Sequence, residues 1–251
     1  MNKNIDWCKI FNNKKFLYYK DSEYLKKNNY LHYSFNLQKI IYPGLSFLKF
    51  KKIFKFMEKN LKVKKKNSIL DFGSGNGAFL NYFIKKYHLK DNYSLELSLP
   101  LINFQKKFIN KTIFYQTHPT KYTIFKKMNN NIVDYSISNS VFQYFYSNLY
   151  CFNVLDFLIR VTKKTILIYD IKDFNKKKSY KEHVRIRQNL SKTEFKKKYK
   201  NTPIRFYKKS YLAKILKKLI KKYDFKFKFI SLPYSSTDSN YGYCLVIQKY
   251  L

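Results

Sequence analysis

The chain has 251 residues, of which 45% are hydrophobic and 20% aromatic, and it carries a formal net charge of +37. This apolar content excludes an intrinsically disordered protein, and the length suits one large α/β domain or two small ones. No apolar run approaches the roughly 18 to 20 residues needed to span a bilayer. The amino-terminal residues lack the apolar core of a signal peptide. The three cysteines, Cys8, Cys151 and Cys244, form no disulfide framework, which fits a reducing compartment. We therefore expect a cytoplasmic protein without a membrane span.

The positive charge comes almost entirely from lysine. Of the 52 basic residues only four are arginine, namely Arg160, Arg185, Arg187 and Arg205. Evolved nucleic-acid surfaces favour arginine, because its planar guanidinium grips phosphate and guanine in two places. Lysine is instead spread along the chain together with Asn, Ile, Tyr and Phe, which share with it codons made only of A and T. We interpret the charge as compositional bias, with nucleic-acid binding as the alternative.

Two regions are expected along the chain. Residues 1–62 are predicted to form a helical amino-terminal cap or lid, with a helix over 45–61 after the break at Pro43-Gly44. Residues 63–251 are predicted to form one domain of short apolar strands alternating with amphipathic helices, with a basic insertion at about 172–206. The expected strands are 68–72, 93–97, 112–116, 132–138, 165–169, 225–231 and 241–249, and the expected helices are 78–87, 100–108, 148–162, 180–199 and 208–222.

This alternation predicts an α/β fold with right-handed crossovers and helices on both faces of a sheet. The sheet is expected to be Rossmann-like, seven-stranded and mostly parallel. Its last two strands are adjacent in the sequence and joined by a loop, which favours an antiparallel terminal strand.

A glycine-rich turn follows the first expected strand. In the stretch SILDFGSGNGAFL, Asp71 precedes Gly73, Gly75 and Gly77, and a helix is expected directly afterwards. Glycine allows a tight turn and a close approach of the backbone to a ligand, and a helix amino terminus offers free N–H donors. Glu96 closes the second expected strand, where doubly wound folds place a carboxylate that binds ribose hydroxyls. Together the two features predict a nucleoside site, with an ordinary glycine-containing turn and a solvated carboxylate at a strand end as the alternatives.

These residues resemble the class I S-adenosylmethionine-dependent methyltransferase family, over about residues 65–251. The segment 71–77 is similar to that family's first motif, E/D-x-G-x-G-x-G, the segment 95–97 to its acidic second motif, and the segment 134–144 to its fourth-strand motif. The resemblance implies S-adenosylmethionine as the methyl donor, with its amino-acid end on the turn and its ribose on Glu96. The donor-binding residues that it implies are Asp71, Gly73, Ser74, Gly75, Gly77, Glu96, Gln116, Thr117, Ser138 and Asn139.

Two details bear on the ligand. The stretch 115–118 after the third strand has no carboxylate to bind the adenine amine, so Gln116 or Thr117 would have to do so. A dinucleotide-dependent oxidoreductase is the rival interpretation of the turn, but its motif is G-x-G-x-x-G and holds a diphosphate. An acidic residue just before the turn, here Asp71, suits a cationic donor better than a diphosphate.

The candidate catalytic residues are few. Methyl transfer from a sulfonium is an in-line displacement, which needs alignment and exclusion of water, and a general base only where the acceptor loses a proton. Asp170 and Asp173 at the end of the fifth strand and His183 in the insertion are the candidates, and each has an ordinary structural role as its alternative. No His, Cys or Asp cluster has metal-ligand spacing, so no metal is expected.

The acceptor side is expected beside the fourth strand and the insertion. Gln143 and Tyr144 follow that strand and are predicted to line the acceptor, with packing at a helix start as the alternative. Arg185 and Arg187 could bind a carboxylate or phosphate of the acceptor, with an ordinary surface position as the alternative. Their side chains lie on one side of an extended segment but about 200° apart on a helix.

The acceptor itself is predicted to be small. Amide methyltransferases that act on nucleic acids often carry N/D-P-P-Y/F after the fourth strand, whereas here Asn139 is followed by Ser140 and Val141. We therefore expect a small-molecule or saccharide-type acceptor, methylated on oxygen or nitrogen. The alternatives are an RNA methyltransferase and a non-catalytic binding protein with the same fold.

Overall fold

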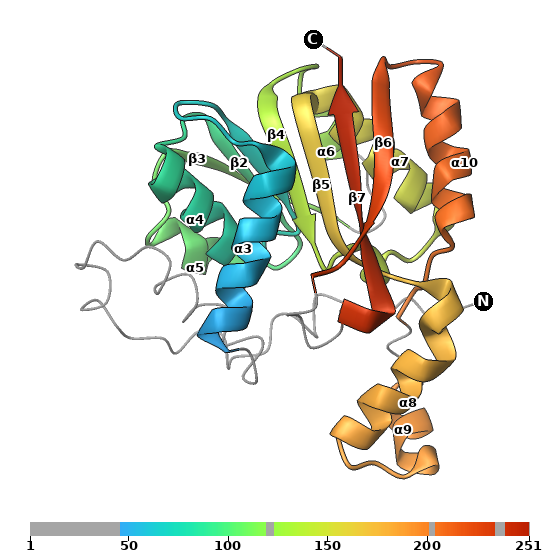
Figure 1. Cartoon of the computed structure of the whole chain (residues 1–251). Coiled ribbons are helices and arrows are strands. Elements are labelled where there is room, and N and C mark those ends of the chain that lie inside the picture. The colour runs from blue at the N-terminus through green and yellow to red at the C-terminus, as the bar shows by residue number, and fades with distance from the viewer. Residues whose placement is uncertain (1–45, 119–122, 201–203, 234–238, 251) are drawn as a thin grey trace.

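Seven strands form one sheet in the order β3-β2-β1-β4-β5-β7-β6 (Figure 1). The computed structural model describes residues 46–118, 123–200, 204–233 and 239–250. Strand pairs are parallel except the two that β7 makes with β5 and β6. The predicted mostly parallel sheet with an antiparallel terminal strand is confirmed. The strands are β1 Ile69–Phe72, β2 Asn92–Glu96, β3 Thr112–Gln116, β4 Val133–Asn139, β5 Thr162–Lys172, β6 Phe225–Ser231 and β7 Gly242–Lys249.

Helices cover both faces of the sheet, as predicted. One hydrophobic cluster joins α3, α4 and α5 to the sheet, and a second joins α6, α7 and α10 to it. Within the described ranges, none of the helices combines the length and apolarity that crossing a membrane requires. The helices are α3 Phe47–Leu61, α4 Ala78–Tyr87, α5 Leu99–Lys106, α6 Thr123–Lys127, α7 Asn148–Val161, α8 Lys177–Arg187, α9 Lys192–Lys198 and α10 Lys209–Ile220, with short 3-10 turns η3 Phe142–Tyr144, η4 Phe174–Lys176 and η5 Ser239–Tyr241.

Helix α3 belongs to the core of the fold. The side chain of Ser46 caps its amino terminus by accepting a hydrogen bond from the backbone of Lys49. Phe50, Phe54 and Met57, spaced at helical intervals, are buried in the cluster that also contains residues of α4 and β5. The rest of the predicted amino-terminal cap or lid, residues 1–45, lies outside the described residues.

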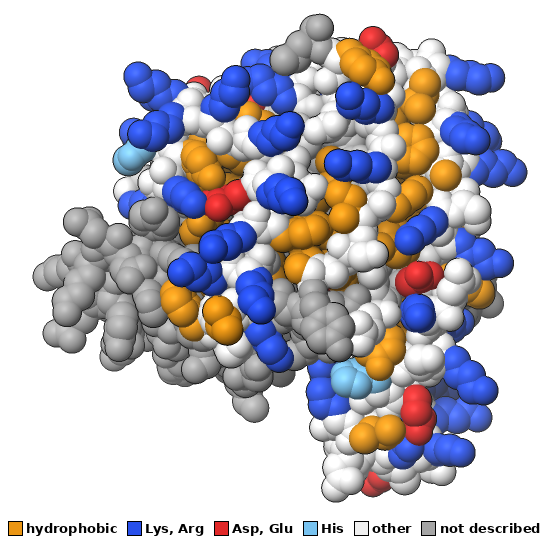
Figure 2. Space-filling view, in the orientation of Figure 1, with side chains coloured by type: hydrophobic (Ala, Val, Ile, Leu, Met, Phe, Trp, Pro, Cys, Tyr) orange, Lys and Arg blue, Asp and Glu red, His pale blue; other side chains and the backbone are white. Residues whose placement is uncertain are grey.

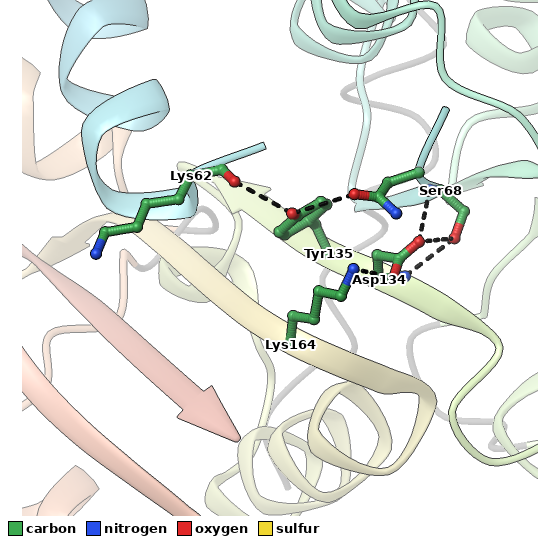
Figure 3. Close-up of polar contacts among 6 residues, drawn as sticks. Lys62, Ser68, Asp134, Tyr135 and Lys164 are labelled. Carbon is green, nitrogen blue, oxygen red and sulfur yellow. Dashed lines mark hydrogen bonds and ion pairs between the residues drawn. The ribbon is translucent and has the colours of Figure 1, made fainter. Parts of the chain in front are cut away.

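A buried carboxylate links strands at the edge of the sheet where the parallel strands begin (Figure 3). Asp134 Oδ2 accepts hydrogen bonds from Ser68 N at 3.0 Å and Ser68 Oγ at 3.2 Å, and Asp134 Oδ1 pairs with Lys164 Nζ at 2.8 Å. Burial raises the pKa of Asp134, but the bonds from Lys164 and Ser68 outweigh it and hold the pKa below its ordinary value. This network joins β1, β4 and β5 at the edge opposite to the carboxyl ends of the parallel strands.

Strand β5 is longer than the sequence predicts. The expected span 165–169 is extended at both ends, because Thr162 pairs with Val133 of β4 and Lys172 pairs with Gly242 of β7. The ladder with β7 shifts register between Ile168 and Ile171, and Asp170 sits in this bulge with φ 61°. Asp170 therefore lies within the strand rather than beyond its end.

The insertion contains two helices rather than the single predicted helix over 180–199. Helix α8 ends before Asn189, whose φ is 51°, and α9 begins after Ser191. Ser191 and Glu194 form a capping box in which each side chain accepts a hydrogen bond from the other residue's backbone. The Ser-x-x-Glu spacing in the sequence was the signal for this break. Figure 1 shows α8 and α9 projecting beyond the end where β5 finishes.

Candidate active site

The turn after β1 takes a conformation that only glycine adopts readily. Gly73, Gly75 and Gly77 have φ of 72°, 58° and 78°, which is the left-handed region. Gly73 N and Ser74 N donate hydrogen bonds to Leu95 O of β2, at 2.7 and 3.3 Å. The turn is thus bound directly to the neighbouring strand, and it is followed by the amino terminus of α4.

Glu96 contacts this turn, as its predicted role requires. Its Oε2 accepts a hydrogen bond from Gly75 N at 2.7 Å, and its Oε1 accepts from Leu97 N at 2.8 Å and Ser98 N at 3.0 Å. A carboxylate has about four acceptor positions, so three are taken and one is open. A ribose bound through two hydroxyls would therefore have to displace the Gly75 N–H.

Asp71 is a buried carboxylate without a partner. Its side chain is 2% exposed, and it has no hydrogen bond or ion pair within the part of the chain that the structure describes. Burial and repulsion from Glu96 raise the pKa of Asp71 well above its ordinary value, and burial also raises the pKa of Glu96 despite its three backbone bonds. Two buried carboxylates side by side form a site that attracts a cation.

The buried side chain of Gln105 holds the glycine turn in place, and the sequence analysis did not predict this role. Gln105 of α5 is fully buried, and its Nε2 donates to Ser74 Oγ at 2.9 Å and to Gly75 O at 2.7 Å. Its Oε1 accepts a hydrogen bond from Ser94 Oγ at 2.8 Å. The side chain therefore fixes the turn relative to β2. Only its position on the sheet-facing side of a helix could have indicated this role.

The predicted adenine-binding residues lie beside Glu96. Thr117 N donates a hydrogen bond to Glu96 O at 2.8 Å, and Gln116 Nε2 donates to Leu97 O at 3.2 Å. Thr117 is buried and Gln116 is exposed. Gln116 ends β3 and Thr117 follows it, at the same edge of the sheet as the glycine turn.

Two buried side-chain oxygens, one near the end of β4 and one in η3, have no hydrogen-bond partner among the described residues. These atoms are Ser138 Oγ and Gln143 Oε1. Asn139 ends the strand and, like Tyr144 in η3, is half-buried. Buried polar groups in native proteins are usually paired, so these two oxygens are suited to contact a bound polar ligand. Both belong to the predicted donor and acceptor residues.

Asp170 is held in a buried ion pair. Lys172 is 1% exposed, and its Nζ donates to Asp170 Oδ1 at 2.9 Å and Oδ2 at 3.1 Å. Ser140 Oγ donates to Asp170 Oδ2 at 2.7 Å. The predicted catalytic carboxylate is thus fully engaged with its neighbours, and the sequence analysis missed both Lys172 and Ser140.

The other two catalytic candidates lie around the start of the insertion. Asp173 caps η4, because its Oδ1 accepts a hydrogen bond from Asn175 N at 3.0 Å. This capping is the structural role expected as the alternative to catalysis. His183 is half-buried in α8, and its ring lies 5.1 Å from that of Tyr241. Neither contacts the glycine turn in any interaction described for it.

The two predicted acceptor arginines lie on helix α8, so the extended arrangement that would place them on one side is excluded. Arg185 forms an ion pair with Glu182 and donates to Leu190 O at 2.8 Å, so it stabilises the end of its own helix. Arg187 is exposed. A third arginine, Arg205, is placed nearer the acceptor side, because its backbone N donates to Gln143 O at 2.8 Å.

No group of three or more His, Cys, Asp or Glu side chains within the described ranges is arranged to hold a metal ion.

The fold is shared with solved methyltransferases. A Methanococcus maripaludis protein assigned to the S-adenosyl-L-methionine-dependent methyltransferases superposes with a TM-score of 0.55 at 16% identity, over 90% of this chain and 95% of that one. A SAM-dependent methyltransferase of Methanosarcina mazei gives 0.53 at 12% identity, over 78% and 97%. The small RNA methyltransferase HEN1 gives 0.54 at 11% identity, over 82% of this chain and 25% of that one.

No protein-family model and no curated protein sequence matches the chain. At these identities the similarity concerns the fold alone. The chain therefore has the fold of S-adenosylmethionine-dependent methyltransferases, as its motifs predict.

Proposed function

We propose that this chain transfers a methyl group from S-adenosylmethionine to a nucleophile at the carboxyl edge of the sheet. The observation that carries the proposal is Asp71, a buried carboxylate without a partner among the described residues, beside Glu96 and the glycine turn. S-adenosylmethionine carries a sulfonium and an ammonium group, and either cation would offset the cost of two buried carboxylates. A diphosphate would be repelled, which argues against a dinucleotide oxidoreductase.

The surrounding residues fit the rest of the donor. The backbone from Gly73 to Gly75 would hold its amino-acid end, supported by Asp71, and Glu96 would bind its ribose. Gln116 and Thr117 lie next to Glu96 and would contact the adenine. When bound, the donor supplies an electrophilic methyl group, and the protein's contribution is to orient it and keep water away.

The acceptor group that we propose is compact and polar, such as a hydroxyl or amine of a small molecule or saccharide. The support is the pair of buried oxygens at Ser138 and Gln143, which can accept hydrogen bonds from such a group. Asp170 is held by Lys172 and Ser140, so we assign it a positioning role rather than that of a general base. RNA is the second acceptor class, and a basic groove in the insertion favours it.

We place this activity in the cytoplasm. The support is that Cys151 and Cys244, the two cysteines within the described ranges, are buried free thiols.

Glu96→Gln is expected to weaken the binding of S-adenosylhomocysteine at least about tenfold. The variant loses the charge that strengthens the bond to a ribose hydroxyl, and a hydrogen bond to a charged group contributes about 1.5–3 kcal/mol. Isothermal titration calorimetry measures the affinity of both proteins. Asp134→Asn is the matched control, because it removes the same charge from a buried carboxylate at the opposite edge of the sheet. Equal losses in the two variants, or a wild-type chain with no measurable affinity, would contradict the proposed function.

The affinity for S-adenosylmethionine is expected to rise with pH. The pKa of Asp71 and of Glu96 is raised in the free protein, and a bound cation favours the ionised carboxylates. Binding therefore releases protons, and it strengthens as pH rises through the raised pKa. For the same reason the ligand-free fold loses stability as pH rises above the ordinary carboxyl range. Calorimetry in buffers of different ionisation enthalpy measures the proton release, which Asp71→Asn should reduce. Proton uptake on binding would refute this electrostatic explanation.

A further inference from the structure

An open groove with a volume of about 1070 Å³ lies along the insertion, lined by residues of α8 and α9 and by Tyr199, Lys200, Ile204 and Phe206. Seven lysines line it, among them Lys192, Lys196 and Lys200. Its lining contains one carboxylate, that of Glu182, which already pairs with Arg185. Figure 2 shows Lys and Arg side chains on these projecting helices, beside some acidic ones, as over the rest of this face. The groove is therefore a strongly cationic surface suited to a polyanion.

Aromatic rings distinguish this groove from the general lysine background. The rings of Phe195 and Tyr199 lie 4.6 Å apart, and those of Tyr180 and Phe206 lie 5.6 Å apart. Phe195, Tyr199 and Phe206 are only half-buried, so each ring keeps exposed surface. A second lysine surface, on α10, contains Lys214, Lys217, Lys218 and Lys221 but no aromatic residue. The compositional bias that favours lysine favours Phe and Tyr as well, so the distinguishing feature is that half-buried rings and lysines line the same groove here, whereas the lysine surface on α10 has no ring.

Cationic side chains interleaved with exposed aromatic rings are the arrangement by which proteins bind single-stranded nucleic acids. Lysines neutralise the phosphates and bases stack on the rings, over about 4–16 nucleotides for one binding fold. An acidic peptide would use the charge but would leave the rings without planar partners.

Hydrogen bonds join the segment that flanks the groove to the acceptor side of the candidate active site. The end of the insertion pairs with its beginning, since Tyr207 N donates to Lys172 O and Phe174 N donates to Tyr207 O. The guanidinium of Arg205 donates to Phe145 O at 2.9 Å and to Tyr146 O at 2.7 Å, in the turn that follows Gln143. The segment that flanks the groove is thus hydrogen-bonded to the turn that follows Gln143.

We propose that this groove binds single-stranded RNA, which favours RNA, the second acceptor class above, over a small molecule, and that a compact group of one nucleotide of that RNA is the methyl acceptor. The second statement rests on the proposed methyl transfer, whereas the first does not. In this arrangement the groove holds the flanking nucleotides, and only the reacting group enters beside Ser138 and Gln143.

The test measures the binding of a fluorescein-labelled oligouridine of about 12 nucleotides, a length within known site sizes, to the full chain by fluorescence anisotropy. The groove variant is Lys192→Gln/Lys196→Gln/Lys200→Gln. The matched control on α10 is Lys214→Gln/Lys217→Gln/Lys221→Gln, which removes the same charge. We expect the groove variant to bind at least about tenfold more weakly, with a salt-dependence slope smaller by about 2 for three lost phosphate contacts. The control should change affinity less than about threefold.

A second variant tests the aromatic part of the proposal. Phe195→Leu keeps an apolar side chain but removes one stacking surface, so we expect RNA binding about fivefold weaker. Thermal unfolding establishes that each variant is folded. Equal losses in the two lysine variants, an unchanged affinity in Phe195→Leu, or equal competition by polyglutamate would overturn the RNA assignment. An oligothymidine that bound more tightly than RNA would do the same.

The two proposals fail in different ways. Calorimetry with S-adenosylhomocysteine on the groove variant should give the wild-type affinity. If the protein binds RNA in the groove but has no affinity for S-adenosylhomocysteine, the RNA-binding proposal stands and the methyl-transfer proposal is refuted. The reverse result would retain methyl transfer and refute the groove.

Discussion

The Lys172→Met variant is expected to lose about 3–5 kcal/mol of unfolding free energy, the cost of breaking a buried ion pair by removing one partner. Lys172 is 1% exposed and donates to both carboxylate oxygens of Asp170. Methionine fills a similar apolar volume but leaves Asp170 charged, with the hydroxyl of Ser140 as its remaining side-chain donor within the described ranges. Urea unfolding followed by circular dichroism measures the loss.

Two further variants separate the ion pair from general effects of the substitution. Lys164→Met breaks the pair with Asp134, where the lysine side chain is 28% exposed, against 1% for Lys172. Fully exposed pairs contribute only about 0–1 kcal/mol, so we expect this partly exposed pair to cost less than the buried one. The double variant Asp170→Asn/Lys172→Met removes both charges and should recover part of the stability that Lys172→Met loses. If Lys172→Met costs no more than Lys164→Met, the Asp170 pair does not hold the end of β5.

Gly73→Ala is expected to lower stability by about 2–5 kcal/mol and to abolish measurable binding of S-adenosylhomocysteine. A Cβ on Gly73 would lie 2.4 Å from Val141 Cγ2 and 2.9 Å from its Cγ1, and the residue has φ +72°. A left-handed conformation costs an alanine about 1–2 kcal/mol, and overpacking adds about 1–3 kcal/mol. The turn must therefore move away from Val141 and from Leu95, to which Gly73 N is bonded. Denaturation and calorimetry measure the two effects.

A double variant serves as the control for the steric clash between the added Cβ and Val141. In Gly73→Ala/Val141→Ala the two Cγ methyl groups are gone, so the double variant should regain the part of the stability lost to the clash. The cost of the left-handed conformation should remain. A double variant with additive losses would contradict the close contact between the turn and the residues after β4.

The sequence predicted those parts of the molecule that depend on local pattern. Short apolar runs between amphipathic helices located all seven strands, and the glycine spacing located the turn. The position of Glu96 at the end of β2 was enough to predict that its carboxylate lies near the turn, because neighbouring parallel strands end at the same edge of a sheet. Its hydrogen bond with Gly75 N was not predicted.

Contacts between distant residues could not be predicted in this way. Lys172 belongs to a run that reads as a polar insertion, and it is buried because β7 extends β5 through Gly242. Gln105 looks like an ordinary helical residue until α5 packs against the turn. The aromatic rings of the groove come together only because the insertion folds back on itself as two helices.

The most direct test of the donor site is a crystal structure of the chain with S-adenosylhomocysteine. We expect the amino-acid end of the ligand over Gly73 to Gly75, with its amine towards Asp71, and a ribose hydroxyl within hydrogen-bond distance of Glu96. The bond from Gly75 N to Glu96 should lengthen or break as the second hydroxyl binds. A nucleoside bound away from this edge, or a turn that stays closed on Glu96 at saturating ligand, would contradict the assignment of a methyl-donor site.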